Sequence, residues 1–326
     1  MSEAPTDRAA VDGSMSDLPA HPLLLEIATA EDVPHEAILA CMRTLPEVAP
    51  ELLAAIARAA EAPITSQIDL NLVYYGVPIL SAAREPRLHA PLLRLLRLPD
   101  DTLEELLGDE YITTVAQIAI GAFDGNAQAL FDLLCDADAS EYVRLPLFGT
   151  VAYLTWLGRI PLETTRAFLH RIDTDRPIPA GDISWNGWET SIELLGWQEF
   201  APLVEAAYAD GRLNTGVSEL RLFRQGLAAA AAAAPDDHSR FEEAGYGYIE
   251  DVLDAIAFPA PLLGVLNEAR VDDLDDALGD GLNHGFDDGL SGGLHDDPND
   301  APTDADRMLW PSDVAGTRRN PLPCRA

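Results

Sequence analysis

Lysine is absent from this sequence of 326 residues, so its 21 basic residues are all arginines, and with 55 acidic residues they give a net charge of −34. A nucleic-acid backbone would repel such a chain, and anionic membrane surfaces are disfavoured for the same reason. Electrostatic attraction favours a basic partner instead. The composition therefore predicts no nucleic-acid and no membrane partner, and it predicts that a protein or peptide partner is basic.

Cysteine is also scarce. The three cysteines, Cys41, Cys135 and Cys324, are too few and too far apart for a disulfide framework. No apolar run approaches the roughly 20 residues that span a bilayer. No basic segment precedes the apolar residues 23–25, as one would in a signal peptide. We therefore expect a cytoplasmic protein.

Motifs for catalysis and metal binding are missing as well. The sequence has no glycine-rich phosphate loop, no HExxH, no nucleophile elbow and no CxxC. Three histidines occur singly near expected helix ends or turns: His35, His89 and His170. Capping or surface placement is the ordinary role of histidines at such positions. We therefore expect no catalytic residues, no metal site and no cofactor.

Apolar residues that recur every three or four positions are abundant, and this spacing indicates amphipathic helices. Between Val115 and Leu134 they form two stripes separated by Asp124-Gly125-Asn126, where glycine can end one helix and a polar residue can begin the next. Comparable turns recur at intervals of roughly 34 to 38 residues, as in helix-pair repeats. The sequence therefore predicts an all-α fold, a HEAT-like stack of antiparallel helix pairs that forms an α-solenoid.

Two further segments have helical character near the end of this region. Residues 228–234 are a run of seven alanines, which we expect at a helix end or as a helical spacer. Ile249, Val252, Leu253 and Ile256 have the spacing of one last amphipathic helix.

Three short stretches carry a resemblance to a known family. They are Leu106-Leu107-Gly108-Asp109, Phe123-Asp124-Gly125 and Tyr142-Val143-Arg144, and Tyr248-Ile249-Glu250-Asp251 is similar to the closing helix of the same family. From about Leu23 to Ala257 the chain resembles an uncharacterised bacterial family, domain of unknown function 1186. The resemblance implies an all-helical, HEAT-like stack, and it implies no established activity.

The two ends of the chain differ in composition from the region between them. Residues 1–22 are polar, acidic and contain proline, which predicts a flexible arm, and residues 23–271 are expected to form the helical repeat domain. From Asp272 to Asp306 there are twelve aspartates and no lysine or arginine. We therefore expect residues 272–326 to be a disordered acidic tail, because such a segment buries too little apolar surface to become ordered.

The last residues, Asn320-Pro321-Leu322-Pro323-Cys324, resemble the opening of the SEC-C zinc motif, which often follows the helical domain of this family. That motif begins with Pro-Cys-Pro-Cys, whereas Leu322 stands in the place of the first cysteine and Cys324 matches the second. One thiolate cannot form a four-ligand zinc site. The segment is therefore expected to be vestigial and without zinc, either by natural loss or because the sequence is truncated.

Five residues are candidates for an interaction surface: Asp109, Asp124, Arg144, Trp185 and Trp188. Each also has a purely structural alternative. The aspartates can cap turns, and the arginine can pair with a carboxylate of the preceding repeat. Tryptophans at this spacing usually belong to the core, although tryptophan is also a common interface anchor.

Together these features favour an uncharacterised helical-repeat scaffold, a non-catalytic module that binds a protein or peptide. The alternative is an enzyme of unrecognised class with its site in the concave groove of the helical stack, where polar residues distant in sequence can converge. A deep pocket with buried carboxylates or histidines would favour catalysis, and a broad open groove would favour binding.

Overall fold

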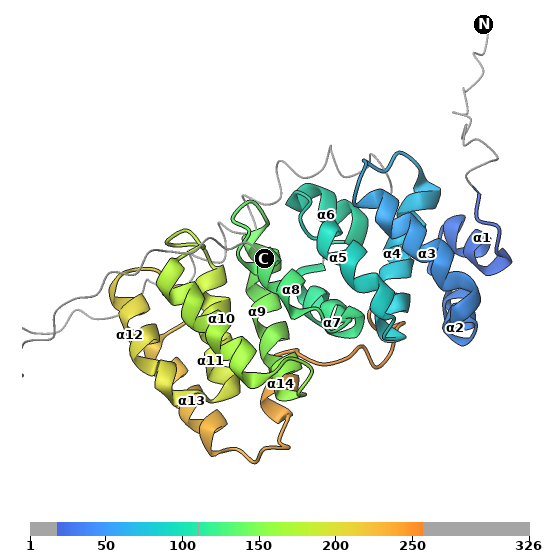
Figure 1. The fold of residues 1–326 in the computed structure, drawn as a ribbon. Coiled ribbons are helices and arrows are strands. Elements are labelled where there is room, and N and C mark those ends of the chain that lie inside the picture. The colour runs from blue at the N-terminus through green and yellow to red at the C-terminus, as the bar shows by residue number, and fades with distance from the viewer. Residues whose placement is uncertain (1–17, 110, 257–326) are drawn as a thin grey trace, which may run out of the picture. The chain divides into compact units, whose positions relative to one another are not determined.

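The computed structural model describes residues 18–109 and 111–256, and these residues form a helical fold without strands (Figure 1). The chain divides into two units, Met1–Leu266 and Asn267–Ala326, and every described residue belongs to the first. The prediction of an all-α fold is confirmed for this part of the chain. Most of the predicted N-terminal arm, the predicted acidic tail and the segment similar to a zinc motif lie outside the described residues.

Fourteen α-helices lie within the described residues. In chain order they are α1 (Pro22–Ala28), α2 (His35–Arg43), α3 (Leu45–Ala59), α4 (Gln67–Ala82), α5 (His89–Leu95), α6 (Asp100–Leu107), α7 (Tyr111–Ala122), α8 (Ala127–Leu134), α9 (Glu141–Trp156), α10 (Leu162–Asp175), α11 (Ser184–Leu195), α12 (Ala201–Ala209), α13 (Leu220–Ala232) and α14 (Ser239–Glu243). Two short 3-10 turns, η1 (Pro86–Leu88) and η2 (Gln198–Phe200), precede α5 and α12.

The turn between α7 and α8 is built as the sequence predicts. Gly125 has a φ of 102°, a left-handed conformation that glycine adopts without strain. The Asp124 side chain accepts a hydrogen bond from the backbone N–H of Asn126 at 2.7 Å. The Asn126 side chain in turn accepts one from the backbone N–H of Ala129 at 3.3 Å, as the N-cap of α8. These short-range contacts end one helix and begin the next.

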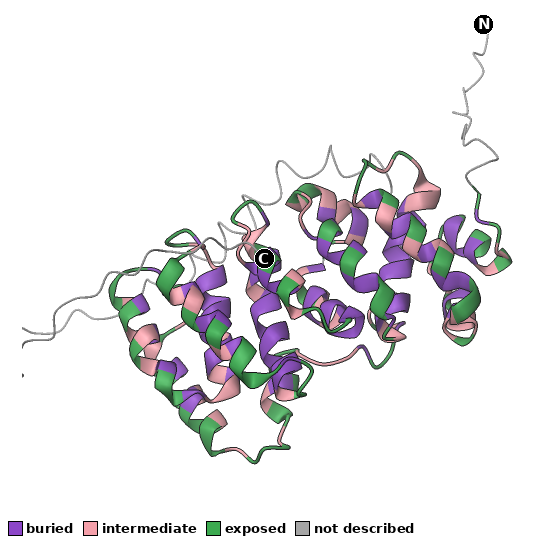
Figure 2. Cartoon of the chain, in the orientation of Figure 1, coloured by how far each residue is buried: buried purple, intermediate pink, exposed green. Residues whose placement is uncertain are grey.

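Five helices form a row in which each packs against the next: α4 contacts α7, α7 contacts α9, α9 contacts α11, and α11 contacts α13. Other helices flank this row, with α3 on α4, α5 on α7, α8 and α10 on α9, and α12 on α13. Figure 2 shows that α4, α7, α9 and α11 are mostly buried and that α13 is mostly exposed. The core of the domain therefore follows the row.

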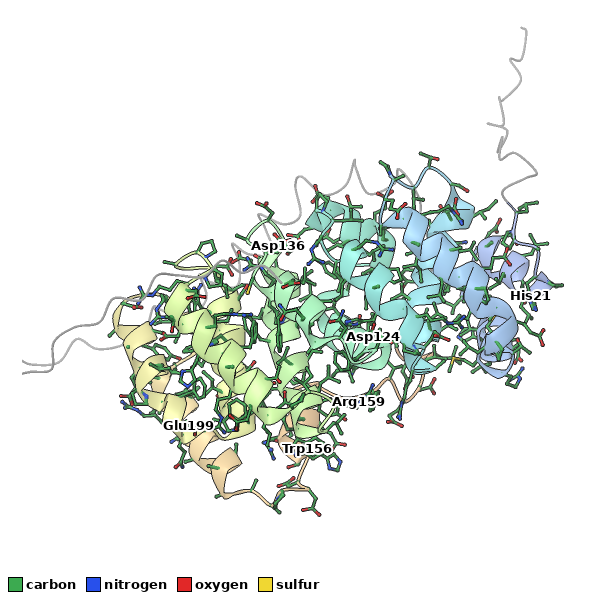
Figure 3. All side chains as sticks on the ribbon, viewed as in Figure 1. His21, Asp124, Asp136, Trp156, Arg159 and Glu199 are labelled. Carbon is green, nitrogen blue, oxygen red and sulfur yellow. The ribbon has the colours of Figure 1, made fainter. Side chains whose placement is uncertain are left out.

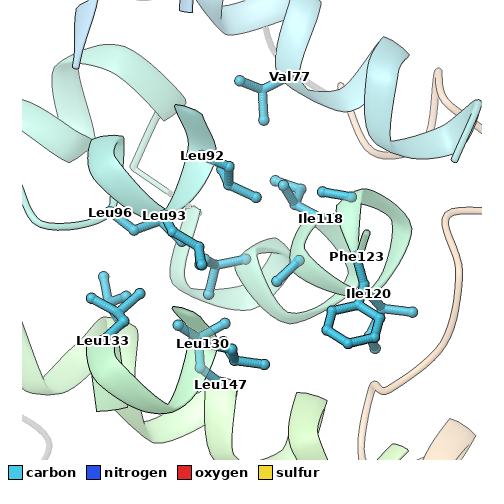
Figure 4. Close-up of a cluster of buried hydrophobic side chains, with 14 of the residues drawn as sticks. Val77, Leu92, Leu93, Leu96, Ile118, Ile120, Phe123, Leu130, Leu133 and Leu147 are labelled. Atoms are coloured by element: carbon cyan, nitrogen blue, oxygen red, sulfur yellow. The ribbon is translucent and has the colours of Figure 1, made fainter. Parts of the chain in front are cut away.

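Apolar side chains fill the space between the row and the flanking helices. Figure 4 shows one cluster, in which Val77, Leu92, Ile118, Leu130 and Leu147 come from five different helices, α4, α5, α7, α8 and α9. Each of these side chains is at most 3% exposed. One continuous core thus joins successive helices of the chain.

Small and hydroxyl-bearing residues bring neighbouring helices of the row close together. Ser81 of α4 donates to a carbonyl of α7 at 3.0 Å, and Ser191 of α11 donates to the carbonyl of Phe148 in α9 at 2.7 Å. At Gly187 of α11, a Cβ atom would overlap the backbone of Leu145 in α9. Because a packed backbone cannot move aside as a flexible side chain can, this crossing requires glycine.

Ion pairs between residues nearly 40 positions apart recur along the chain. They join Arg97 to Asp136, a separation of 39, Arg144 to Asp182, a separation of 38, and Arg212 to Asp173, a separation of 39. Ion pairs therefore link segments about 40 residues apart at three places, with the arginine first in two of them and the aspartate first in the third.

The predicted last helix at residues 249–256 is wrong. The structure has turns there and no α-helix. Ile249, Val252 and Ile256 are nevertheless buried, as the inward side of a helix would be. Packing against other helices decides the conformation of this segment, since intrinsic helical preference is weak compared with tertiary contacts.

Candidate functional site

A cleft lies between α11, α13 and α14, which are close together in Figure 1. Its volume is about 540 Å³, within the range of about 300–1,000 Å³ that is typical of ligand pockets. Glu193 of α11, Gly226 of α13, Arg240 and Glu243 of α14, and Asp237 just before α14 are among the residues that line it. Three carboxylates and one guanidinium therefore border the same space.

Small residues of α13 create this space. The C-terminal half of α13 is the alanine run, and a methyl group fills little of the gap to α11. Gly226 has no side chain where the carboxylate of Glu193 lies, and a Cβ atom there would overlap that carboxylate. The segment that the sequence suggests as a helical spacer therefore forms one wall of the cleft.

Glu193 has a strongly shifted pKa. Partial burial raises its pKa from 4.5 to about 7, and the charge of Glu189 adds to this effect. Within residues 18–109 and 111–256, the Glu193 carboxylate accepts no hydrogen bond and forms no ion pair. Its negative charge is therefore poorly compensated at neutral pH, and a cation placed beside it would stabilise it.

Glu189, one turn earlier on α11, contributes to the acidity of this region from inside the domain. Its side chain is buried, and the hydroxyl groups of Tyr208 and Ser218 each donate to its carboxylate at 2.6 Å. Burial nevertheless raises the pKa of Glu189 above its ordinary value. Glu189 is thus inaccessible to a ligand, and it acts on the cleft through its charge.

Arg240 fixes the wall of the cleft that α14 provides. Its Nε donates to the carbonyl of Leu194 at the end of α11 at 2.7 Å, and its guanidinium also donates to the carbonyl of Asp237. The Asp237 carboxylate accepts hydrogen bonds from the backbone N–H and the hydroxyl group of Ser239 at 3.0 and 2.7 Å. The hydrogen bond from Arg240 to Leu194 therefore links α14 to α11, and the contacts of Asp237 order the start of α14.

A second hollow, of about 430 Å³, adjoins the first and shares Ala230, Ala233 and Arg240 with it. Its lining includes the side chains of Trp156 and Trp197. Trp156, labelled in Figure 3, donates from its Nε1 to the carbonyl of Pro235 at 3.0 Å. An acidic hollow next to one lined by tryptophans can receive a cationic and an apolar side chain of the same ligand.

We expect the Glu193→Gln variant to be more stable than the wild type above pH 7. The pKa of Glu193 in the folded state, about 7, exceeds its ordinary value of 4.5, so the folded state binds the proton more tightly and stability falls as the pH rises between these values. Glutamine removes this loss. The gain at pH 8 should be about 1–2 kcal/mol, which allows for solvent screening of a partly exposed carboxyl group.

Urea denaturation of both proteins at pH 5 and at pH 8 measures this difference. Glu163→Gln is the matched control, because the Glu163 side chain is 85% exposed. A gain in stability for Glu193→Gln that is the same at both pH values would contradict the assigned pKa.

The five residues predicted to form an interaction surface are not among those that line the cleft. Asp109 and Asp124 are exposed on turns, whereas Trp185 and Trp188 are completely buried. The indole nitrogens of the two tryptophans donate to backbone carbonyls at 3.0 Å. Both tryptophans are therefore part of the core, and an interaction role for them would have to be indirect.

Arg144, the remaining residue of this set, is also interior, with 2% exposure. Its guanidinium pairs with Asp182 and donates to the carbonyl of Ala139 at 3.0 Å. Asp182 comes from a later segment of the chain, not from the preceding repeat that the sequence suggests. The pair joins the start of α9 to the loop before α11.

Sequence reasoning missed Glu193 and the polar residues around α14. Glu193 lies between apolar neighbours on α11, as many surface glutamates of amphipathic helices do. Its burial depends on packing against α13, whose residues come about 30 positions later in the sequence. The spacing of apolar residues within α11 does not show that α13 packs there. The alanine run is the one available signal, because it leaves room beside α11.

The described residues hold no group of three or more His, Cys, Asp or Glu side chains that could bind a metal ion. Among the helices of that same part of the chain, none has the length and apolar character needed to cross a membrane.

A family model described as Protein of unknown function (DUF1186) matches residues 23–214, more than half of the chain. This match supports the resemblance noted from the sequence, over a span that covers α1 to α12 and ends before α13 and α14. Comparison with curated proteins found no match, and neither did comparison with solved structures.

Proposed function

This chain belongs to the family of proteins of unknown function (DUF1186), and we propose that it is a non-catalytic scaffold that binds a basic protein or peptide in the cleft. In this proposal the helices form a HEAT-like stack, which is supported by the row of successive contacts and by the recurring ion pairs. One observation carries the proposal. Glu193 places a carboxylate that lacks a partner among the described residues on the wall of a 540 Å³ cleft.

Charge complementarity supports a cationic ligand. A partly buried carboxylate without a partner is unfavourable, and a guanidinium or ammonium group within hydrogen-bond distance offsets that cost. Asp237 and Glu243 add two further carboxylates to the lining of the same cleft. The net charge of −34 also attracts a basic partner over a longer range.

An enzyme of unrecognised class remains the alternative function, with Glu193 as a general acid or base. The pKa of about 7 favours this role, because proton transfer at neutral pH is most effective from such a group. Catalysis would also need a second reactive group beside the substrate. The Ser239 hydroxyl group lines the cleft, but it already donates to Asp237 at 2.7 Å. The geometry therefore supports binding better than nucleophilic catalysis.

The proposal is tested with two fluorescent peptides, each with one central residue between leucines. The central residue is arginine in one peptide and citrulline, its neutral analogue, in the other. Wild-type protein should bind the arginine peptide about tenfold more tightly, since one charge-assisted hydrogen bond is worth about 1.5–3 kcal/mol. Added salt should weaken that binding.

The Glu193→Gln variant should lose the preference for arginine, and the control Glu163→Gln should keep it. Equal affinity of the wild type for both peptides would contradict a cation site. An unchanged preference in Glu193→Gln would place the site elsewhere. Turnover of a substrate that depends on the Glu193 carboxyl group would favour the enzyme.

A further inference from the structure

Residues 245–256, called here the strap, run from the end of α14 back along the row of helices (Figure 1). At its start, the side chain of Gln117 in α7 donates to the carbonyl of Gly245 at 3.4 Å. The ring of Tyr246 then lies directly on Gly149 of α9, where a Cβ atom would overlap the ring. The strap thus packs on the backbone of α9 at a position that only glycine leaves open.

Tyr248 connects the strap to the segment that follows α4. The guanidinium of Arg84, two residues after α4, lies 3.7 Å from the centroid of the Tyr248 ring, a cation–π contact. Tyr153 of α9 meets the same ring edge-on, with centroids 6.2 Å apart. Beyond it, buried Ile249 and Val252 continue the packing. Contacts of side chains therefore hold the strap on α7, on α9 and on Arg84 after α4.

The strap follows directly from α14, a wall of the cleft. α14 has only five residues, too few to be a stable helix without tertiary contacts. Phe241 of α14 is completely buried and packs against Tyr153 and Trp156 of α9, with ring centroids 5.5 and 5.4 Å apart. Tyr153 therefore contacts both α14 and the strap, through Phe241 and Tyr248.

We infer that the strap positions α14, so that Tyr246 and Tyr248, which do not line the cleft, determine whether its third wall is in place. When the strap is docked, Arg240 and Glu243 border the cleft that Glu193 also lines. When the strap is released, α14 loses the support on its C-terminal side and the cleft opens. Ligand binding in the cleft and docking of the strap then favour each other, by thermodynamic reciprocity. The effect on ligand binding rests on the proposed function, whereas the effect on α14 does not.

Hydrogen exchange of the full-length protein tests this inference. In Tyr248→Ala, amide exchange in residues 239–256 should become about tenfold faster while exchange in α7 and α11 stays unchanged, because only the local opening is affected. Tyr248→Phe keeps the ring and its cation–π contact, so it should behave like the wild type. Arg84→Gln removes only the cation, and it should change the same residues by a smaller factor.

Affinity for the arginine peptide should fall several-fold in Tyr248→Ala and return in Tyr248→Phe. Faster exchange of the strap without any change in α14 would overturn the inference. Equally faster exchange in all helices would also overturn it, because the tyrosine would then act on overall stability. If the wild type binds no basic peptide, the proposed function fails, and the exchange in α14 still decides the role of the strap.

Discussion

Replacing Trp188 with alanine should lower the free energy of unfolding by about 3–5 kcal/mol, the cost of deleting a large, fully buried aromatic side chain. Trp188 is 0% exposed at the centre of α11, and it contacts Trp185 edge-on with ring centroids 5.6 Å apart. Its Nε1 also donates to the carbonyl of Leu169 in α10 at 3.0 Å, so the change also removes a buried hydrogen bond between α11 and α10. The loss combines a cavity with a broken link between helices.

Chemical denaturation of wild type, Trp188→Ala and Trp188→Phe separates these contributions. Phenylalanine keeps much of the volume and removes the donor, so its cost should lie clearly below that of alanine. A cost under about 1.5 kcal/mol for Trp188→Ala would contradict a position at the centre of the core, where larger losses are typical.

Replacing Arg144 with alanine should cost a similar amount, about 3–5 kcal/mol, because it leaves a buried charge without its partner. The Asp182 carboxylate is only 10% exposed, and the Arg144 guanidinium is its ionic partner. The carbonyl of Ala139 loses its donor at the same time. Removing one partner of this pair therefore lowers the free energy of unfolding far more than removing one partner of an exposed ion pair.

A double-mutant cycle checks the effect of the pair. Arg144→Ala with Asp182→Ala should cost less than the sum of the two single variants, because the double variant leaves no unpaired charge. Arg176→Ala is the matched control. Its guanidinium is 59% exposed and pairs with Asp210 at 3.5 Å, so the cost should stay below about 1 kcal/mol. Additive costs at Arg144 and Asp182 would mean that the two side chains do not interact.

The helices were predictable because their signals are local. Spacing of apolar residues sets each amphipathic face, and Asp124-Gly125-Asn126 forms its turn through contacts no more than three residues apart. The strap shows the limit of this reasoning. Its apolar residues have helical spacing, but the structure has turns there. Tyr246 packs on α9 and the ring of Tyr248 lies against Arg84, and these contacts between residues distant in sequence favour the turns.

The cleft could not be predicted for a related reason. Its space comes from side chains that are small, chiefly the alanines of α13 and Gly226, and small side chains produce no recognisable motif. The pKa of Glu193 depends on burial by a helix that follows about 30 residues later, so the shift requires the fold. The two tryptophans show the opposite case, in which a sequence signal is present without an exposed site. Tryptophan is typical of interfaces, but Trp185 and Trp188 are buried in the core.

Carbon-detected NMR of the Glu193 carboxyl group tests most directly the proposal that Glu193 binds a cationic side chain. Without ligand, Glu193 should titrate with a pKa of about 7. A saturating amount of the arginine peptide should lower that pKa, since a neighbouring positive charge favours the ionised carboxylate, and the citrulline peptide should not. A Glu193 signal that titrates near 4.5, or that is unchanged when the arginine peptide is bound, would contradict the account.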